Sequence, residues 1–148
     1  MASVALISGM PGQGKSFLAG KLAAAGFEPV SVDHEYVQFV RTECPQIYFD
    51  NLNRHTFLHF LILQNDSPSN QERWRDHLLA VIREKTRMHP RIAIEGWLLG
   101  HYEDFTLELR DEGHHVYEIE AHQPRYRLEG QMLTADQVVA SLHERTSA

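Results

Sequence analysis

Eight residues near the start of the chain carry the clearest chemical pattern. Gly9 to Ser16 read GMPGQGKS, which matches the spacing G-x-x-x-x-G-K-[S/T] of a phosphate-binding loop. Glycines at this spacing let successive backbone N–H groups point inward at phosphate oxygens, and the following helix adds its positive N-terminal end. Lys15 would reach the β- and γ-phosphates, and Ser16 would bring its hydroxyl to Mg²⁺. The motif predicts a bound triphosphate, with ATP and Mg²⁺ as the expected cofactors. The residues expected to hold the nucleotide are Gly9, Gly12, Gln13, Gly14, Lys15, Ser16 and Phe17.

Two acidic residues are candidates for the same chemistry. A metal bound to a triphosphate also needs a carboxylate, usually at the end of a neighbouring buried strand. Asp33 follows the short run PVSV, and Glu95 follows RIAI. Gly96, directly after Glu95, would let the backbone turn tightly beside the nucleotide. We therefore expect both carboxylates to belong to the site.

These residues have to be positioned by an alternation of strands and helices. Ser3–Ser8 (SVALIS) is a continuous apolar run typical of a strand buried on both faces. The loop, a helix over 16–25 and a strand over 29–32 complete a unit that predicts a right-handed crossover and a parallel sheet. The remaining strands are expected at 91–94, 116–121 and 126–129. The remaining helices are expected at 35–41, 51–64, 71–88, 102–112 and 136–145. The prediction is one three-layer α/β domain over 1–148, with a parallel sheet of about five strands and a helical insertion between the second and third strands.

Three stretches together resemble the small P-loop kinases, the group that acts on nucleosides, nucleotides and small metabolites. They are GMPGQGKS, the short gap from it to Asp33, and IAIEGWLL at 92–99, whose Glu-Gly pair is most similar to the uridine kinase type of Walker B motif. The resemblance implies the P-loop NTPase fold. It also implies that Asp33 meets the acceptor hydroxyl as base or orienting group, and that Glu95 serves Mg²⁺ together with Ser16. It implies a nucleotide-binding core over 1–33 and 91–148 and an acceptor-binding segment over 34–90.

The chain departs from this group between the expected fourth and fifth strands. Nucleotide kinases of the group close a lid there, with arginines that neutralise the transferring phosphoryl, whereas this chain has only HQPR at 122–125. Arg125 is therefore the expected catalytic arginine beside Lys15 and Asp33. The alternatives are Arg127, an arginine of a partner, or one of the arginines of the insertion, Arg41, Arg54 and Arg73. A reduced lid weakens water exclusion and transition-state stabilisation.

Composition limits the partners and the compartment. The net charge of −6 disfavours a partner bound through nucleic-acid phosphates. The single cysteine, Cys44, rules out an internal disulfide and fits a reducing compartment. The N-terminal segment MASVALISG has no basic leader, and no apolar run approaches the ~20 residues of a bilayer span. We expect a cytoplasmic protein without a membrane partner.

The sequence as a whole predicts an ATP- and Mg²⁺-dependent phosphotransferase. It would move the γ-phosphate to a hydroxyl or phosphate of a small molecule, nucleoside or nucleotide. One alternative is an ATPase or ATP-sensing module that acts through a protein partner, as phage-type assembly ATPases do; such motors usually carry Asp-Glu where this chain has Glu95-Gly96. Another is a kinase acting on a nucleic-acid base or end, which the short basic stretch at 83–91 keeps open.

Overall fold

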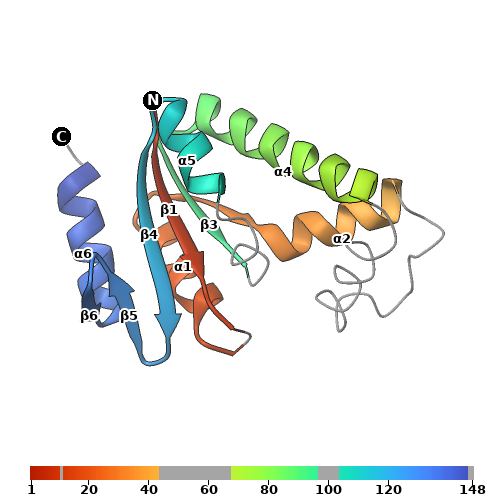
Figure 1. The fold of residues 1–148 in the computed structure, drawn as a ribbon. Coiled ribbons are helices and arrows are strands. Elements are labelled where there is room, and N and C mark those ends of the chain that lie inside the picture. Colours follow the sequence, from red (N-terminus) through yellow and green to blue (C-terminus); the bar gives the residue numbers. More distant parts are fainter. Residues whose placement is uncertain (11, 44–67, 97–103, 147–148) are drawn as a thin grey trace.

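The chain forms a six-stranded sheet with helices on both faces (Figure 1). The structure is a computed structural model, and it describes residues 1–10, 12–43, 68–96 and 104–146. The strand order is β2-β3-β1-β4-β5-β6. The strands are β1 (Ser3–Ser8), β2 (Glu28–Ser31), β3 (Arg91–Glu95), β4 (His115–His122), β5 (Arg125–Leu128) and β6 (Gln131–Leu133). The predicted α/β class is confirmed.

The sheet is mixed, which corrects the prediction of a parallel sheet of about five strands. β2, β3, β1 and β4 are parallel, whereas β5 pairs antiparallel with β4 and β6 pairs antiparallel with β5. Only Gln123 and Pro124 separate β4 from β5. A parallel connection needs a dozen or more residues, so a link this short closes a hairpin and reverses the chain. β6 was not predicted.

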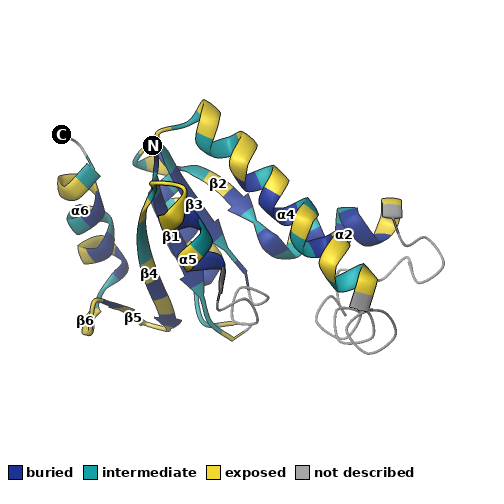
Figure 2. Ribbon diagram, turned by 45° about the horizontal axis from the view of Figure 1, so that its top comes forward, coloured by how far each residue is buried: buried dark blue, intermediate teal, exposed yellow. Residues whose placement is uncertain are grey.

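Helices cover the two faces of the sheet unequally. They are α1 (Lys15–Ala24), α2 (Val32–Glu43), α4 (Pro68–Met88), α5 (Asp104–Asp111) and α6 (Ala135–Thr146). α1 and α6 pack on one face, against the side chains of Ala5 and Ile7. α2, α4 and α5 pack on the other face, against Val4 and Leu6. Successive side chains of β1 point to opposite faces because a strand has a two-residue period. Figure 2 shows the central strands of the sheet as mainly buried.

The predicted helices at 16–25, 35–41, 71–88, 102–112 and 136–145 are each present within a few residues of their expected bounds. The helix predicted at 51–64 lies outside the described residues. Among the helices that the structure describes, none combines the length and the apolar character needed to cross a membrane.

The start of α2 differs from the sequence prediction in a way that moves Asp33. We expected a strand over 29–32 that ends at Asp33, but β2 stops at Ser31 and Asp33 lies in the first turn of α2. The Ser31 hydroxyl accepts a hydrogen bond from the His34 N–H (3.3 Å), as a helix-capping serine does. Asp33 therefore sits near the positive N-terminal end of a helix, where a carboxylate is favoured.

Aromatic packing attaches α2 to α4. Trp74 of α4 is fully buried and lies edge-on to Tyr36 at 5.2 Å between ring centroids, with Phe39 at 5.5 Å. Aromatic pairs in this geometry contribute beyond their buried area. The contacts therefore hold α2, the helix that carries Asp33, against α4.

Candidate functional site

The loop between β1 and α1 has the backbone that its glycines allow. Gly12 and Gly14 both adopt left-handed conformations (φ 81° and 85°) that L side chains rarely take. Gly14 forms the N-cap of α1 and no side chain caps the helix. The first N–H groups of the helix are therefore available as hydrogen-bond donors to an anion. Pro11 lies outside the described residues.

Lys15 is the buried cation of this loop. Its side chain is only 8% exposed, and Nζ donates a hydrogen bond to the Met10 carbonyl at 2.9 Å. Burial lowers the pKa of Lys15 from its ordinary value, while the negative charges of Asp33 and Glu95 act in the opposite direction. Lys15 thus lies within electrostatic reach of both predicted carboxylates.

Glu95 is a half-buried carboxylate of the site. It ends β3, where its Cα is the register partner of Ser31 in β2. Burial first, and then the charge of Asp33, raise the pKa of Glu95; a hydrogen bond from Ser31 and the charge of Lys15 lower it. The net rise in the pKa of Glu95 means that ionising it beside the charge of Asp33 is unfavourable unless a further cation compensates the two carboxylates.

Gly96 allows Asp33 to lie close to the end of β3. A Cβ added at Gly96 would lie 3.0 Å from Asp33 Oδ1 and 2.9 Å from the Val32 Cβ, a separation below normal van der Waals contact. The Gly96 N–H also donates to the Ile7 carbonyl at 3.2 Å, which ties the end of β3 to β1. The absence of a side chain at Gly96 therefore lets the first turn of α2 rest beside Glu95.

These groups meet where the chain changes faces of the sheet. β1 and β3 are neighbours, yet the helix after β1 packs on one face and α5, which follows β3 in the described chain, packs on the other. In open α/β sheets such a switch point opens a crevice outside the carboxyl ends of the strands, and ligands bind there. The loop follows β1 at this point and Glu95 ends β3.

The oxygen donors at this edge suit Mg²⁺. Ser16 is exposed in the first turn of α1, and the carboxylates of Asp33 and Glu95 are hard oxygen ligands of the kind that Mg²⁺ prefers. No cluster of three or more His, Cys, Asp or Glu side chains able to hold a metal occurs in the described part of the chain. Mg²⁺ usually binds few protein ligands and completes its shell with phosphate oxygens and water, so Ser16, Asp33 and Glu95 are the residues that could serve it.

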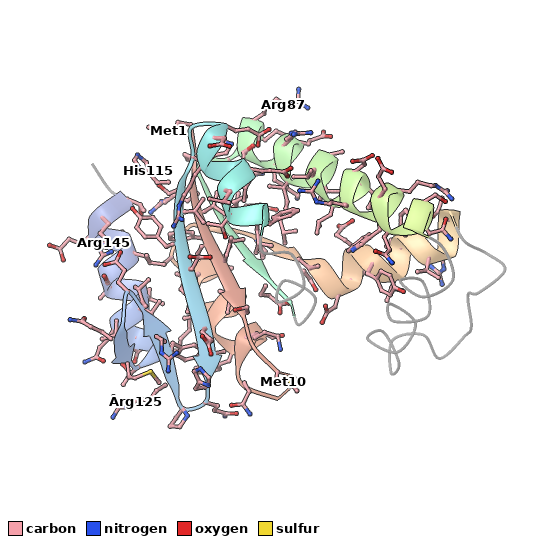
Figure 3. The ribbon with its side chains drawn as sticks, in the orientation of Figure 1. Met1, Met10, Arg87, His115, Arg125 and Arg145 are labelled. Atoms are coloured by element: carbon pink, nitrogen blue, oxygen red, sulfur yellow. The ribbon has the colours of Figure 1, made fainter. Side chains whose placement is uncertain are left out.

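The other predicted residues are spread more widely. Phe17 is 61% exposed on α1, with Lys21 Nζ 5.2 Å from its ring centroid. Arg125 is exposed at the β4–β5 hairpin, and Figure 3 shows it directed away from Met10 of the loop. Arg127 lies 3.6 Å from Glu120. The charges of Asp33 and Glu95 act on Lys15, and Gly96 lets Asp33 approach the end of β3. Arg125 lies exposed on the hairpin.

Two residues of this region were missed by sequence reasoning. Ser31 bonds Glu95 and caps α2, and Tyr126 donates its hydroxyl proton to the Gly14 carbonyl at 2.8 Å. Tyr126 alternates with the exposed Arg125 and Arg127, which marks it as an inward-facing strand residue. Its contact with a loop 112 residues earlier has no local signal.

Comparison with family models, with curated proteins and with solved structures found no match to this chain.

Proposed function

We propose that the chain is a P-loop kinase that binds ATP with Mg²⁺ at Gly9–Ser16 and transfers the γ-phosphate to a hydroxyl or phosphate of a small acceptor. The observation that carries the proposal is the burial of Lys15 among the loop backbone, Asp33 and Glu95. A buried ammonium at a glycine-rich helix N-terminus is costly for a structural role, whereas phosphate binding uses both features. The change of sheet face between β1 and β3 supports the same reading, because ligands of open α/β sheets bind at such a switch point.

Each residue has a role in this proposal. Lys15 exchanges the Met10 carbonyl for the β- and γ-phosphate oxygens, and the loop N–H groups orient the phosphates. Asp33 orients the acceptor hydroxyl and takes its proton as the phosphoryl group leaves ATP. Ser16 and Glu95 would hold Mg²⁺, which neutralises charge on the phosphates when bound. The segment 34–90, which begins within α2, would carry the acceptor site.

The experiment that tests the proposal separates binding from transfer. ATP binding is measured by titration calorimetry with Mg²⁺, and transfer by incubation with γ-labelled ATP and a panel of nucleosides, nucleotides, small metabolites and oligonucleotides. We expect Lys15→Ala to abolish both. Lys21→Ala, on the same helix but paired with Asp136, is the control and should change neither. Asp33→Asn should retain ATP binding and lose transfer. Normal transfer by Asp33→Asn would remove Asp33 from its role, and a wild-type protein that binds no ATP would end the proposal.

The position of Arg125 favours a second candidate. The β4–β5 link replaces a lid with a tight hairpin, and its arginine points away from Met10 in the loop (Figure 3). An ATPase that borrows an arginine from a protein partner would need no lid of its own. Hydrolysis of labelled ATP without transfer to any member of the panel, together with assembly that depends on ATP, would support this candidate over the kinase.

A further inference from the structure

One residue pair of the β4–β5 hairpin contacts both ends of the phosphate-binding loop. Ala121 and Tyr126 are register partners across the hairpin. A Cβ added at Gly9 would lie 2.9 Å from the Ala121 carbonyl oxygen and 3.2 Å from the Ala121 Cβ. A Cβ added at Gly14 would lie 2.7 Å from the Tyr126 hydroxyl. The first and last glycines of the loop therefore both rest against a single cross-strand pair.

The hydrogen bond from Tyr126 acts on the peptide unit that precedes Lys15. The Gly14 carbonyl accepts the Tyr126 hydroxyl at 2.8 Å and the Leu18 N–H at 3.1 Å. The Gly14 C=O and the Lys15 N–H belong to one planar trans peptide, so they point in opposite directions. A carbonyl held toward Tyr126 directs the Lys15 N–H away from the hairpin, as a loop that presents amides to phosphate requires.

Tyr126 is itself held firmly. Its side chain is only 2% exposed and packs with Leu18 and Val138 in the core beneath α1 and α6. A tyrosine hydroxyl is protonated at neutral pH and can donate, and burial raises the pKa of Tyr126 further. Because the ring fills the core and only the oxygen reaches the loop, phenylalanine removes the hydrogen bond and preserves the packing.

We propose that the Ala121–Tyr126 pair positions the phosphate-binding loop for the triphosphate, with the Tyr126 hydroxyl as the positioning donor. The proposal rests on the proposed function, since it assigns the hairpin to the nucleotide-binding half of the same site. In this arrangement the β4–β5 hairpin, which occupies the position of the lid, supports the loop from the side that faces the protein interior. Tyr126 is a positioning residue and touches no reacting atom.

The test compares Tyr126→Phe with Tyr117→Phe. Tyr117 lies on β4 against the same core, with Arg145 over its ring, so it controls for loss of a tyrosine hydroxyl elsewhere. We expect Tyr126→Phe to weaken Mg²⁺–ATP binding by about three- to tenfold, the effect of one neutral hydrogen bond. The melting temperature should fall by no more than about a few degrees, as expected for one lost hydrogen bond, and kcat should change little. Tyr117→Phe should match the wild type in all three.

Amide hydrogen exchange of the nucleotide-free protein tests the brace without ATP. The N–H groups of residues 12–16 should exchange faster in Tyr126→Phe than in the wild type, and those of Tyr117→Phe should be unchanged. Unaltered exchange and unaltered ATP affinity in Tyr126→Phe would overturn the inference while leaving the proposed function in place. Faster exchange in a protein whose wild type binds no ATP would overturn the proposed function and the nucleotide role of the pair, and retain only the contact.

Discussion

The two edges of the parallel strands handle charge in opposite ways. At the carboxyl edge, Lys15 is buried and Glu95 is half-buried, and desolvation is the largest cause of the pKa shift of each. At the amino edge, Lys85 pairs with Glu28 at 3.1 Å and Arg83 with Glu112 at 2.6 Å, with all four side chains partly exposed. The hydrogen bond from Lys85 lowers the pKa of Glu28, so the ion pair, and not desolvation, decides the direction of this pKa shift.

This difference is consistent with the site proposed at the carboxyl edge. Exposed ion pairs of the amino-edge kind contribute little to stability and are screened by salt. Buried charges that are not fully compensated cost stability, and proteins keep them where function uses them. Each prediction below sets a carboxyl-edge residue against a control outside that edge.

The largest expected effect separates Glu95 from Glu28. Glu95→Gln should lower phosphotransfer at least about a hundredfold, because an amide supplies no charge to Mg²⁺. Glu28→Gln, on the neighbouring strand at the opposite edge, should leave the rate unchanged. Initial rates with γ-labelled ATP at saturating Mg²⁺ measure both. Equal rates in the two variants would erase the contrast between the edges.

A smaller effect concerns the close approach at Gly96. Gly96→Ala should destabilise the protein by about 1–3 kcal/mol, because the new Cβ meets Val32 and Asp33 at distances that force a shift. Gly20→Ala is the matched control, since Gly20 lies inside α1 with nothing within 4 Å of an added Cβ. It should stabilise the protein by roughly 0.5–1 kcal/mol. Urea unfolding with a constant m-value measures both. If Gly96→Ala proved neutral, the first turn of α2 would not be held against β3.

The smallest effect is on the pH dependence of stability. Because the folded-state pKa of Glu95 is raised, the folded protein favours the protonated form. Protonated Glu95 therefore contributes to the stability of the wild type at low pH. This contribution should be lost as pH rises from the ordinary glutamate pKa through the raised one. Glu95→Gln should remove that loss and be more stable than the wild type at neutral pH, with the difference vanishing at low pH. Glu28→Gln should show the opposite sign, because the pKa of Glu28 is lowered. Urea midpoints over a pH series would show it, and a constant Glu95→Gln difference would contradict the assignment.

Part of the site could be read from the sequence because its signals are local. The loop lies within eight consecutive residues, and the left-handed glycines at 12 and 14 are what such a loop needs. Asp33 and Glu95 could be nominated because each follows a short apolar run. The exact end of β2 could not, since the cap by Ser31 competes with one further strand residue, and such boundaries depend on packing.

The antiparallel direction of β5 did have a local signal, because the link between the strands is too short for a crossover. The prediction of a parallel sheet overlooked that limit. The contact between Tyr126 and Gly14 had no local signal, because it depends on how the hairpin packs against the loop.

The sequence by itself determined the loop, most of the order of strands and helices along the chain, and the residue types available for phosphate and metal. These depend on backbone freedom and hydrophobic period over a few residues. Only the tertiary structure decided which charges share a buried edge and which residue pair braces the loop. Burial and cross-strand register join residues far apart in the chain, and they arise when the elements pack.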